Sequence, residues 1–110
     1  MSETVPLDAV MRSLADPTRR AVFERIVAAE EIGVAALTRG SGVTQSAVSQ
    51  HLRQLKEAGL VADRAEGRQV FYRANPVGLV PLFDWMGHYA PFWQERLADL
   101  RKLLKEIEDE

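Results

Sequence analysis

The chain has 110 residues, of which 46% are hydrophobic and 27% charged, and it contains no cysteine. This length predicts one domain, residues 1–110, with a modest core, and the composition is that of a folded chain. The absence of cysteine excludes disulfides and thiolate metal sites and fits a reducing cytoplasm. There is no apolar run of about 18 residues that could cross a bilayer, and the first ten residues lack a signal-peptide pattern. We therefore expect a cytoplasmic protein without a membrane partner.

The net charge of −2 is unevenly distributed. Residues 39–73 hold six basic and three acidic side chains, a local charge of +3, so the other residues together carry −5. Charges farther away than about 8 to 10 Å are largely screened at physiological salt. A basic middle segment can therefore face nucleic acid despite the acidic total.

The N-terminal third predicts two helices. Residues 6–14 place Leu7, Val10, Met11 and Leu14 at helical spacing, and Asp16-Pro17 marks the start of a second helix that ends near Ala29. The second helix is expected to bury Ala21, Val22, Ile26 and Phe23. Arg19 and Arg20 could contact phosphate, but solvated or structurally paired arginines are the favoured interpretation.

Residues 33–60 predict a helix-turn-helix. A short helix over 33–39, with Val34 and Leu37 inward, precedes the turn 40–43 and a second helix within Thr44–Leu60. Thr44 is the expected N-cap, and Gly59 is expected to end the helix in the left-handed conformation.

The second of these helices has two unlike sides. Winding it at about 100° per residue places Val48, His51, Leu52 and Leu55 on an inner arc. The outer arc carries Ser46, Ser49, Gln50 and Arg53. Hydroxyls, an amide and a guanidinium suit contact with base edges and phosphates, which predicts a recognition helix. His51 is interpreted as a packed core histidine.

Residues 61–74 predict a β-hairpin, which after a recognition helix is a wing. Two β-prone runs, 61–64 and 70–73, flank the glycine-containing tip 65–69. Arg68 at the tip is expected to contact DNA, whereas for Arg64 at the base contact and no contact are equally weighted.

Residues 79–107 predict one long helix. Its apolar residues share one seam about 140° wide. Pro91 should bend this helix by removing a hydrogen bond to Gly87, but both lie on the polar side, so one kinked helix is favoured over two. The helix would be about 40 Å long, against a radius of gyration of about 13 Å for a compact domain of this size.

A seam longer than its own domain predicts a homodimer through the first and last helices. The interface is expected to contain Trp85, Tyr89, Trp93, Leu97, Leu100 and Leu104. Some of the aromatic residues could instead complete the core of the single chain.

Three stretches carry a resemblance to a known family: LADPTRRAVFERI at 14–26, VTQSAVSQHLRQLKEAGLV at 43–61 and GRQVFYRANP at 67–76. The chain resembles the bacterial ArsR-type winged helix-turn-helix transcriptional regulators. The resemblance implies a mainly α fold with a small β-hairpin and a homodimeric repressor on a pseudo-palindromic operator, released by a signal. It implies DNA contact by Thr44, Gln45, Ser46, Ser49, Gln50, Arg53 and the wing residue Arg68.

The sequence departs from the metal-sensing members of that family. The cysteine pair of those members is replaced by the apolar run at 34–37, and on the last helix only Asp84 and His88 stand four residues apart, without a second histidine. We therefore expect no metal and no cofactor, and the inducer stays open. A metal-responsive sensor using Asp84 and His88, or a protein-interaction module, is the alternative function.

An enzyme is not expected. Ser49 and His51 lie about 160° apart on their helix, so they cannot form a nucleophile and base pair. The chain also lacks a phosphate-cradling glycine motif.

Overall fold

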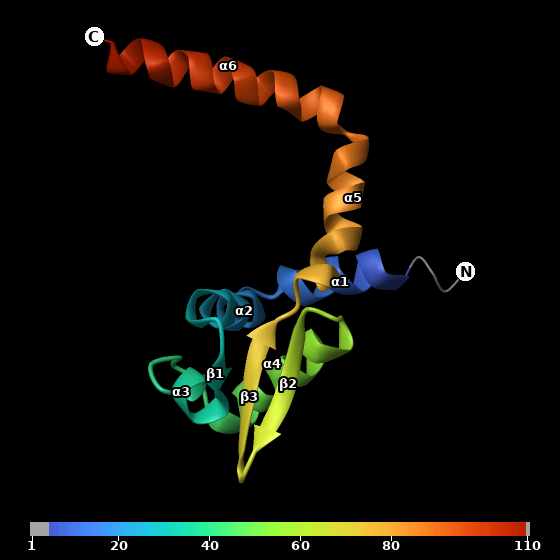
Figure 1. The fold of residues 1–110 in the computed structure, drawn as a ribbon, viewed down its shortest axis with the longest axis vertical. Coiled ribbons are helices and arrows are strands. Elements are labelled where there is room, and N and C mark those ends of the chain that lie inside the picture. Colours follow the sequence, from blue (N-terminus) through green and yellow to red (C-terminus); the bar gives the residue numbers. More distant parts are fainter. Residues whose placement is uncertain (1–4, 110) are drawn as a thin grey trace.

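The computed structural model describes residues 5–109 and shows a mainly helical body with a small antiparallel sheet (Figure 1). The elements in chain order are α1 (Val5–Ala15), α2 (Pro17–Ala29), β1 (Ile32–Gly33), α3 (Val34–Thr38), α4 (Gln45–Glu57), β2 (Val61–Glu66), β3 (Gln69–Ala74), the 3-10 helix η2 (Pro76–Leu79), α5 (Val80–His88) and α6 (Ala90–Glu108). The predicted fold, helical with a winged helix-turn-helix, is confirmed. None of the helices within residues 5–109 is long and apolar enough to cross a membrane.

The sheet has three strands, in the order β1-β3-β2. The predicted hairpin is β2 and β3, paired from Val61 with Ala74 to Glu66 with Gln69. The short strand β1 was not predicted, and it pairs Ile32 with Tyr72 and Gly33 with Phe71. A two-residue strand has no periodicity of its own, so only its pairing with β3 defines it.

The core lies where α1, α2, α3 and α4 meet the start of β2. Its buried hydrophobic residues are Val10, Val22, Phe23, Ile26, Leu37, Val48, Leu52, Leu55, Leu60 and Val61. The expectation that Ala21 is buried is wrong, because this residue is exposed. Ala21 lies about 140° around α2 from Ile26, on the solvent side.

Both predicted helix starts are confirmed. Asp16 Oδ1 accepts from the Arg19 amide at 3.0 Å, with Pro17 at the first helical position, and Thr44 Oγ1 accepts from the Ala47 amide at 3.1 Å. Gly59 has a φ of 80°, which gives α4 the predicted left-handed ending.

Arg19 and Arg20 bind the end of α1. Arg19 is buried, and its Nε donates to the Ser13 carbonyl at 2.8 Å, while Nη1 of Arg20 donates to the Leu14 carbonyl at 2.6 Å. These carbonyls belong to the last turn of α1, where no further amide can reach them within the helix. The favoured interpretation of structural pairing is confirmed.

The prediction of a single kinked helix at the C-terminus is wrong. The chain breaks at Tyr89, which has φ −108° and ψ 16°, so that α5 ends at His88 and α6 begins at Ala90. Pro91 has no amide to donate to Gly87, and its ring would press on that carbonyl in a continuous helix. The Trp93 indole Nε1 donates to the Met86 carbonyl at 3.0 Å, and the Tyr89 amide donates to the same carbonyl at 3.0 Å.

Helix α5 leads away from the body toward the end of the molecule opposite the wing tip, and at the elbow α6 turns sharply and runs sideways across that end (Figure 1). Its main neighbour is α5, and no described residue of α6 is buried. The radius of gyration is 17.7 Å, well above the value of about 13 Å for a compact chain of this length. Within residues 5–109, therefore, no other part of the chain covers the apolar side of α6.

Candidate nucleic-acid interface

Helix α4 presents one side to the core and the other to solvent. Val48, Leu52 and Leu55 are each at most 1% exposed, which fixes the rotation of the helix. The opposite side must then face outward, as the sequence pattern indicates.

The predicted outer arc forms a shallow surface hollow of about 480 Å³. Gln45, Ser46, Ser49, Gln50 and Arg53 line it, and all of these are exposed except Ser49, which is half-buried. Thr44 is also exposed, although its hydroxyl already accepts the Ala47 amide. The structure therefore brings the predicted residues of α4 together on one open face.

The wing places Arg68 beside this face. Gly67 at the tip has a φ of 64°, a conformation that glycine adopts without a Cβ clash, and the exposed Arg68 follows it. Arg68 and the α4 residues Gln45 and Ser49 line a second hollow, of about 470 Å³, between α3, α4 and the wing.

Arg64 is held by the protein itself. Its guanidinium donates to both carboxylate oxygens of Glu31 at 2.8 Å and to Glu66 Oε1 at 2.7 Å, and it lies 5.0 Å from the centre of the Phe71 ring. The hydrogen bonds from Arg64 lower the pKa of Glu31, and the two carboxylates raise the pKa of Arg64. Of the two interpretations left open for Arg64, these contacts favour a structural one.

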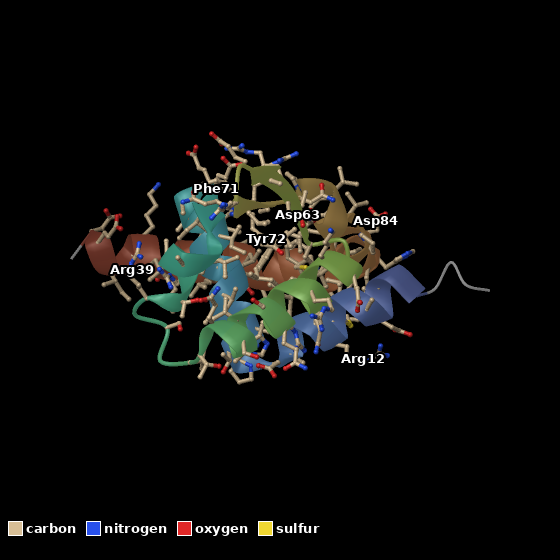
Figure 2. All side chains as sticks on the ribbon, turned by 90° about the horizontal axis from the view of Figure 1, so that it is seen from below. Arg12, Arg39, Asp63, Phe71, Tyr72 and Asp84 are labelled. Carbon is tan, nitrogen blue, oxygen red and sulfur yellow. The ribbon has the colours of Figure 1, made fainter. Side chains whose placement is uncertain are left out.

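Arg39 was not among the predicted contact residues. It lies at the end of α3, is exposed, and lines the same hollow as Arg68. Figure 2, which views the molecule from below Figure 1, shows Arg39 at the α3 side, with Arg12 and Asp84 toward the opposite side. The sequence contained one signal for a role of Arg39, namely that this basic residue directly precedes the turn that begins at Gly40.

The predicted dimer residues are placed on α5 and α6. Trp85, Tyr89 and Trp93 lie around the elbow, where with Met86 and Phe92 they line a wholly apolar hollow of about 400 Å³. Leu97, Leu100 and Leu104 continue along α6 and are all exposed. One aromatic contact within the chain is the tilted pair of Trp85 and Tyr89, with ring centres 5.3 Å apart.

The two histidines have different surroundings. His51 is half-buried beside Leu52, and its Nδ1 is buried without a hydrogen-bond partner within the described part of the chain. His88 and Asp84 are both exposed on α5. In the described residues 5–109, no three His, Cys, Asp or Glu side chains gather as a metal-ion site.

Comparison with known proteins finds the same architecture. A family profile described as a helix-turn-helix domain matches residues 14–64. The HTH-type transcriptional regulator Rv2034 of Mycobacterium tuberculosis is 39% identical over 97 residues, which cover 88% of this chain and 87% of that protein. The crystal structure of a possible transcriptional regulator for arsenical resistance is 36% identical, has a TM-score of 0.67, and is matched over 81% of this chain and 92% of its own. The chain belongs to the ArsR family of transcriptional regulators.

A further ArsR-type relative has been studied in solution. It is the homodimeric winged helix-turn-helix DNA-binding domain of a possible ArsR-family regulator from Mycobacterium bovis, 26% identical, with a TM-score of 0.65 over 82% of each chain. In the present ArsR-family protein, α4 is the second helix of the helix-turn-helix, and the hairpin of β2 and β3 is the wing. Together they form the exposed face described above.

Proposed function

We propose that this protein is a sequence-specific DNA-binding transcriptional repressor that binds a pseudo-palindromic operator as a homodimer. The observation that carries the proposal is the outer arc of α4, where Ser46, Gln50 and Arg53 are exposed beside the arginine at the wing tip. A helix with this surface can enter the major groove, while the wing holds the flanking backbone or minor groove. The regulators found by comparison support the class of function.

The proposed DNA contacts comprise residues of two kinds. Gln50 and Arg53 carry side chains long enough to reach base edges, and Arg68 suits a phosphate or the minor groove. The full set is Thr44, Gln45, Ser46, Ser49, Gln50, Arg53 and Arg68. Because the Thr44 hydroxyl oxygen accepts the Ala47 amide, Thr44 would contact DNA through its free O–H donor, its second lone pair or its methyl group.

The proposed dimer uses the uncovered apolar side of the C-terminal helices. Its residues are Trp85, Tyr89, Trp93, Leu97, Leu100 and Leu104, and the homodimeric Mycobacterium bovis relative supports this assembly. We assign one winged helix-turn-helix domain to residues 1–110, with the helix-turn-helix at 33–60, the wing at 61–74 and the dimerisation segment at 79–107. The function is regulatory rather than enzymatic, and a repressor of this kind acts in the cytoplasm, where bacterial DNA is.

The test is binding to the DNA upstream of the protein's own gene at two salt concentrations. Several phosphate contacts make affinity fall by about three to five orders of magnitude between 50 and 200 mM salt. A protein-interaction module, which the wholly apolar elbow favours as second candidate, would show little DNA affinity and no such salt dependence. Affinity that is absent or insensitive to salt would therefore favour the module.

A further inference from the structure

We propose that Arg39 contacts a DNA phosphate and that the hollow between α3, α4 and the wing seats one strand of the DNA backbone. This inference rests on the proposed function, because it names a second part of the same DNA-binding face. The hollow is shared by Arg39 at the end of α3 and Arg68 at the wing tip, which are 29 positions apart in the sequence.

The lining of this hollow suits an anionic strand. Its polar side chains are Arg39, Gln45, Ser49, Arg68 and Gln69, and no Asp or Glu is among the described residues that line it. Two guanidinium groups without a carboxylate give the hollow a positive potential, and the amides and hydroxyl supply neutral hydrogen bonds. A phosphodiester backbone is the ligand that matches both features.

The backbone of Arg39 is fixed while its side chain is exposed. Arg25 Nη1 donates to the Leu37 carbonyl at 2.6 Å and to the Arg39 carbonyl at 3.3 Å, and Nη2 donates to the Ala36 carbonyl at 3.1 Å. Arg25 on α2 therefore holds the C-terminal end of α3 against the body. A side chain on a fixed backbone loses less conformational entropy when it binds, which favours a phosphate contact at this position.

Position also supports the contact. Gln45 and Ser49 lie one turn apart on α4 and belong both to this hollow and to the hollow of the outer arc. The two hollows are therefore neighbours across the same edge of α4. A duplex whose major groove receives α4 has one of its strands over that edge, between α3 and the wing.

The experiment measures affinity against salt for the parent, Arg39→Gln, Arg39→Lys and Lys102→Gln, with a specific duplex selected from random DNA and with an unselected duplex. Lys102 is an exposed cation on the side of α6 opposite Leu97, so its variant removes the same charge away from the hollow. Because each chain of the proposed homodimer contributes one Arg39, we expect Arg39→Gln to bind both duplexes more weakly and to reduce the slope of log affinity against log salt by about 1.8, which is about 0.9 for each of two phosphates. Arg39→Lys should retain the slope, and Lys102→Gln should match the parent.

A double-mutant cycle locates the contact. Methylphosphonate substitution neutralises one phosphate at a time in the selected duplex, and we expect one position in each half-site whose neutralisation weakens the parent but not Arg39→Gln. Arg39→Gln binding like the parent, while Arg53→Ala loses affinity, would overturn the role of Arg39 and leave the proposed function standing. A parent without salt-dependent DNA binding would instead overturn the proposed function.

Discussion

Arg64 and Glu31 form a two-point ion pair, in which Nε and Nη2 of the guanidinium each lie 2.8 Å from a carboxylate oxygen of Glu31. The pair joins the wing to the segment between α2 and β1, 33 positions earlier in the chain. Because Arg64 also binds Glu66 and lies over Phe71, its guanidinium is committed to the base of the wing. The ion pair therefore ties the base of the hairpin that carries Arg68 to the body, next to the pairing of β3 with β1.

Acid should release this ion pair. Arg64 lowers the pKa of Glu31 below its ordinary value of 4.5, so the stabilisation is present above that value and is lost as pH falls through the lower pKa of the folded protein. In Glu31→Gln this part of the acid dependence should be missing. Thermal unfolding from neutral pH downward measures it, with Glu24→Gln, an exposed carboxylate on α2, as control. An unchanged acid dependence in Glu31→Gln would show that the pair contributes nothing to stability.

Arg53 and Arg68 should affect DNA binding in different ways. If Arg53 reads a guanine, Arg53→Ala weakens operator binding by about 1 to 3 kcal/mol, and the loss depends on the base at one position. Arg68→Ala should weaken all sequences more evenly, because a phosphate contact carries no sequence information. Gel-shift titrations with single-base operator variants separate the two effects. Parent-like binding by both variants would mean that the DNA-binding face is wrongly assigned.

Gly78 should tolerate no side chain. A Cβ at this position would lie 2.7 Å from the Gly59 carbonyl carbon and 3.1 Å from Leu60 Cα, and would collide with the Gly59 carbonyl oxygen. These atoms cannot shift freely, since Leu60 is buried and its carbonyl accepts the Asn75 amide at 2.9 Å. Gly78→Ala should lower the free energy of unfolding by about 1 to 3 kcal/mol, as measured in urea at fixed protein concentration.

Gly87→Ala is the matched control for Gly78→Ala. Gly87 lies in α5, and a Cβ there would meet no atom within 4 Å. Alanine is favoured over glycine by about 0.5 to 1 kcal/mol in a helix interior, but Gly87 is the last but one residue of α5, so we expect this variant to be about as stable as the parent. Equal losses in the two variants would contradict the proposed close approach of Gly78 to the turn after α4.

A charge on the exposed seam of α6 should dissociate the proposed dimer. Leu100 is 50% exposed in the single chain, and its burial against a second copy would be lost in Leu100→Glu, which would also place a carboxylate in an apolar contact. Light scattering after size-exclusion chromatography should show a parent of two chains and a Leu100→Glu variant of one, with Lys102→Gln unchanged. A parent of one chain would remove the dimer from the proposal.

Local features of this protein follow from the sequence by itself. Asp16-Pro17 and Thr44 predict where α2 and α4 begin, because the capping groups act within three residues of themselves. The spacing of Val48, Leu52 and Leu55 predicts which side of α4 is buried, and thereby which side can meet DNA. These features depend only on residues that are close together in the chain, so they can be predicted from the sequence.

Only the tertiary structure decided the features that join distant segments. The pairing of Arg64 with Glu31, the shared hollow of Arg39 and Arg68, and the strand at Ile32 all depend on how α3 and the wing pack. The elbow at Tyr89 belongs to the same class, because Pro91 allows either a kink or a break, and the conformation of Tyr89 distinguishes them. Periodicity specifies the face of a helix, whereas the direction of the next element is set by contacts that lie far apart in the chain.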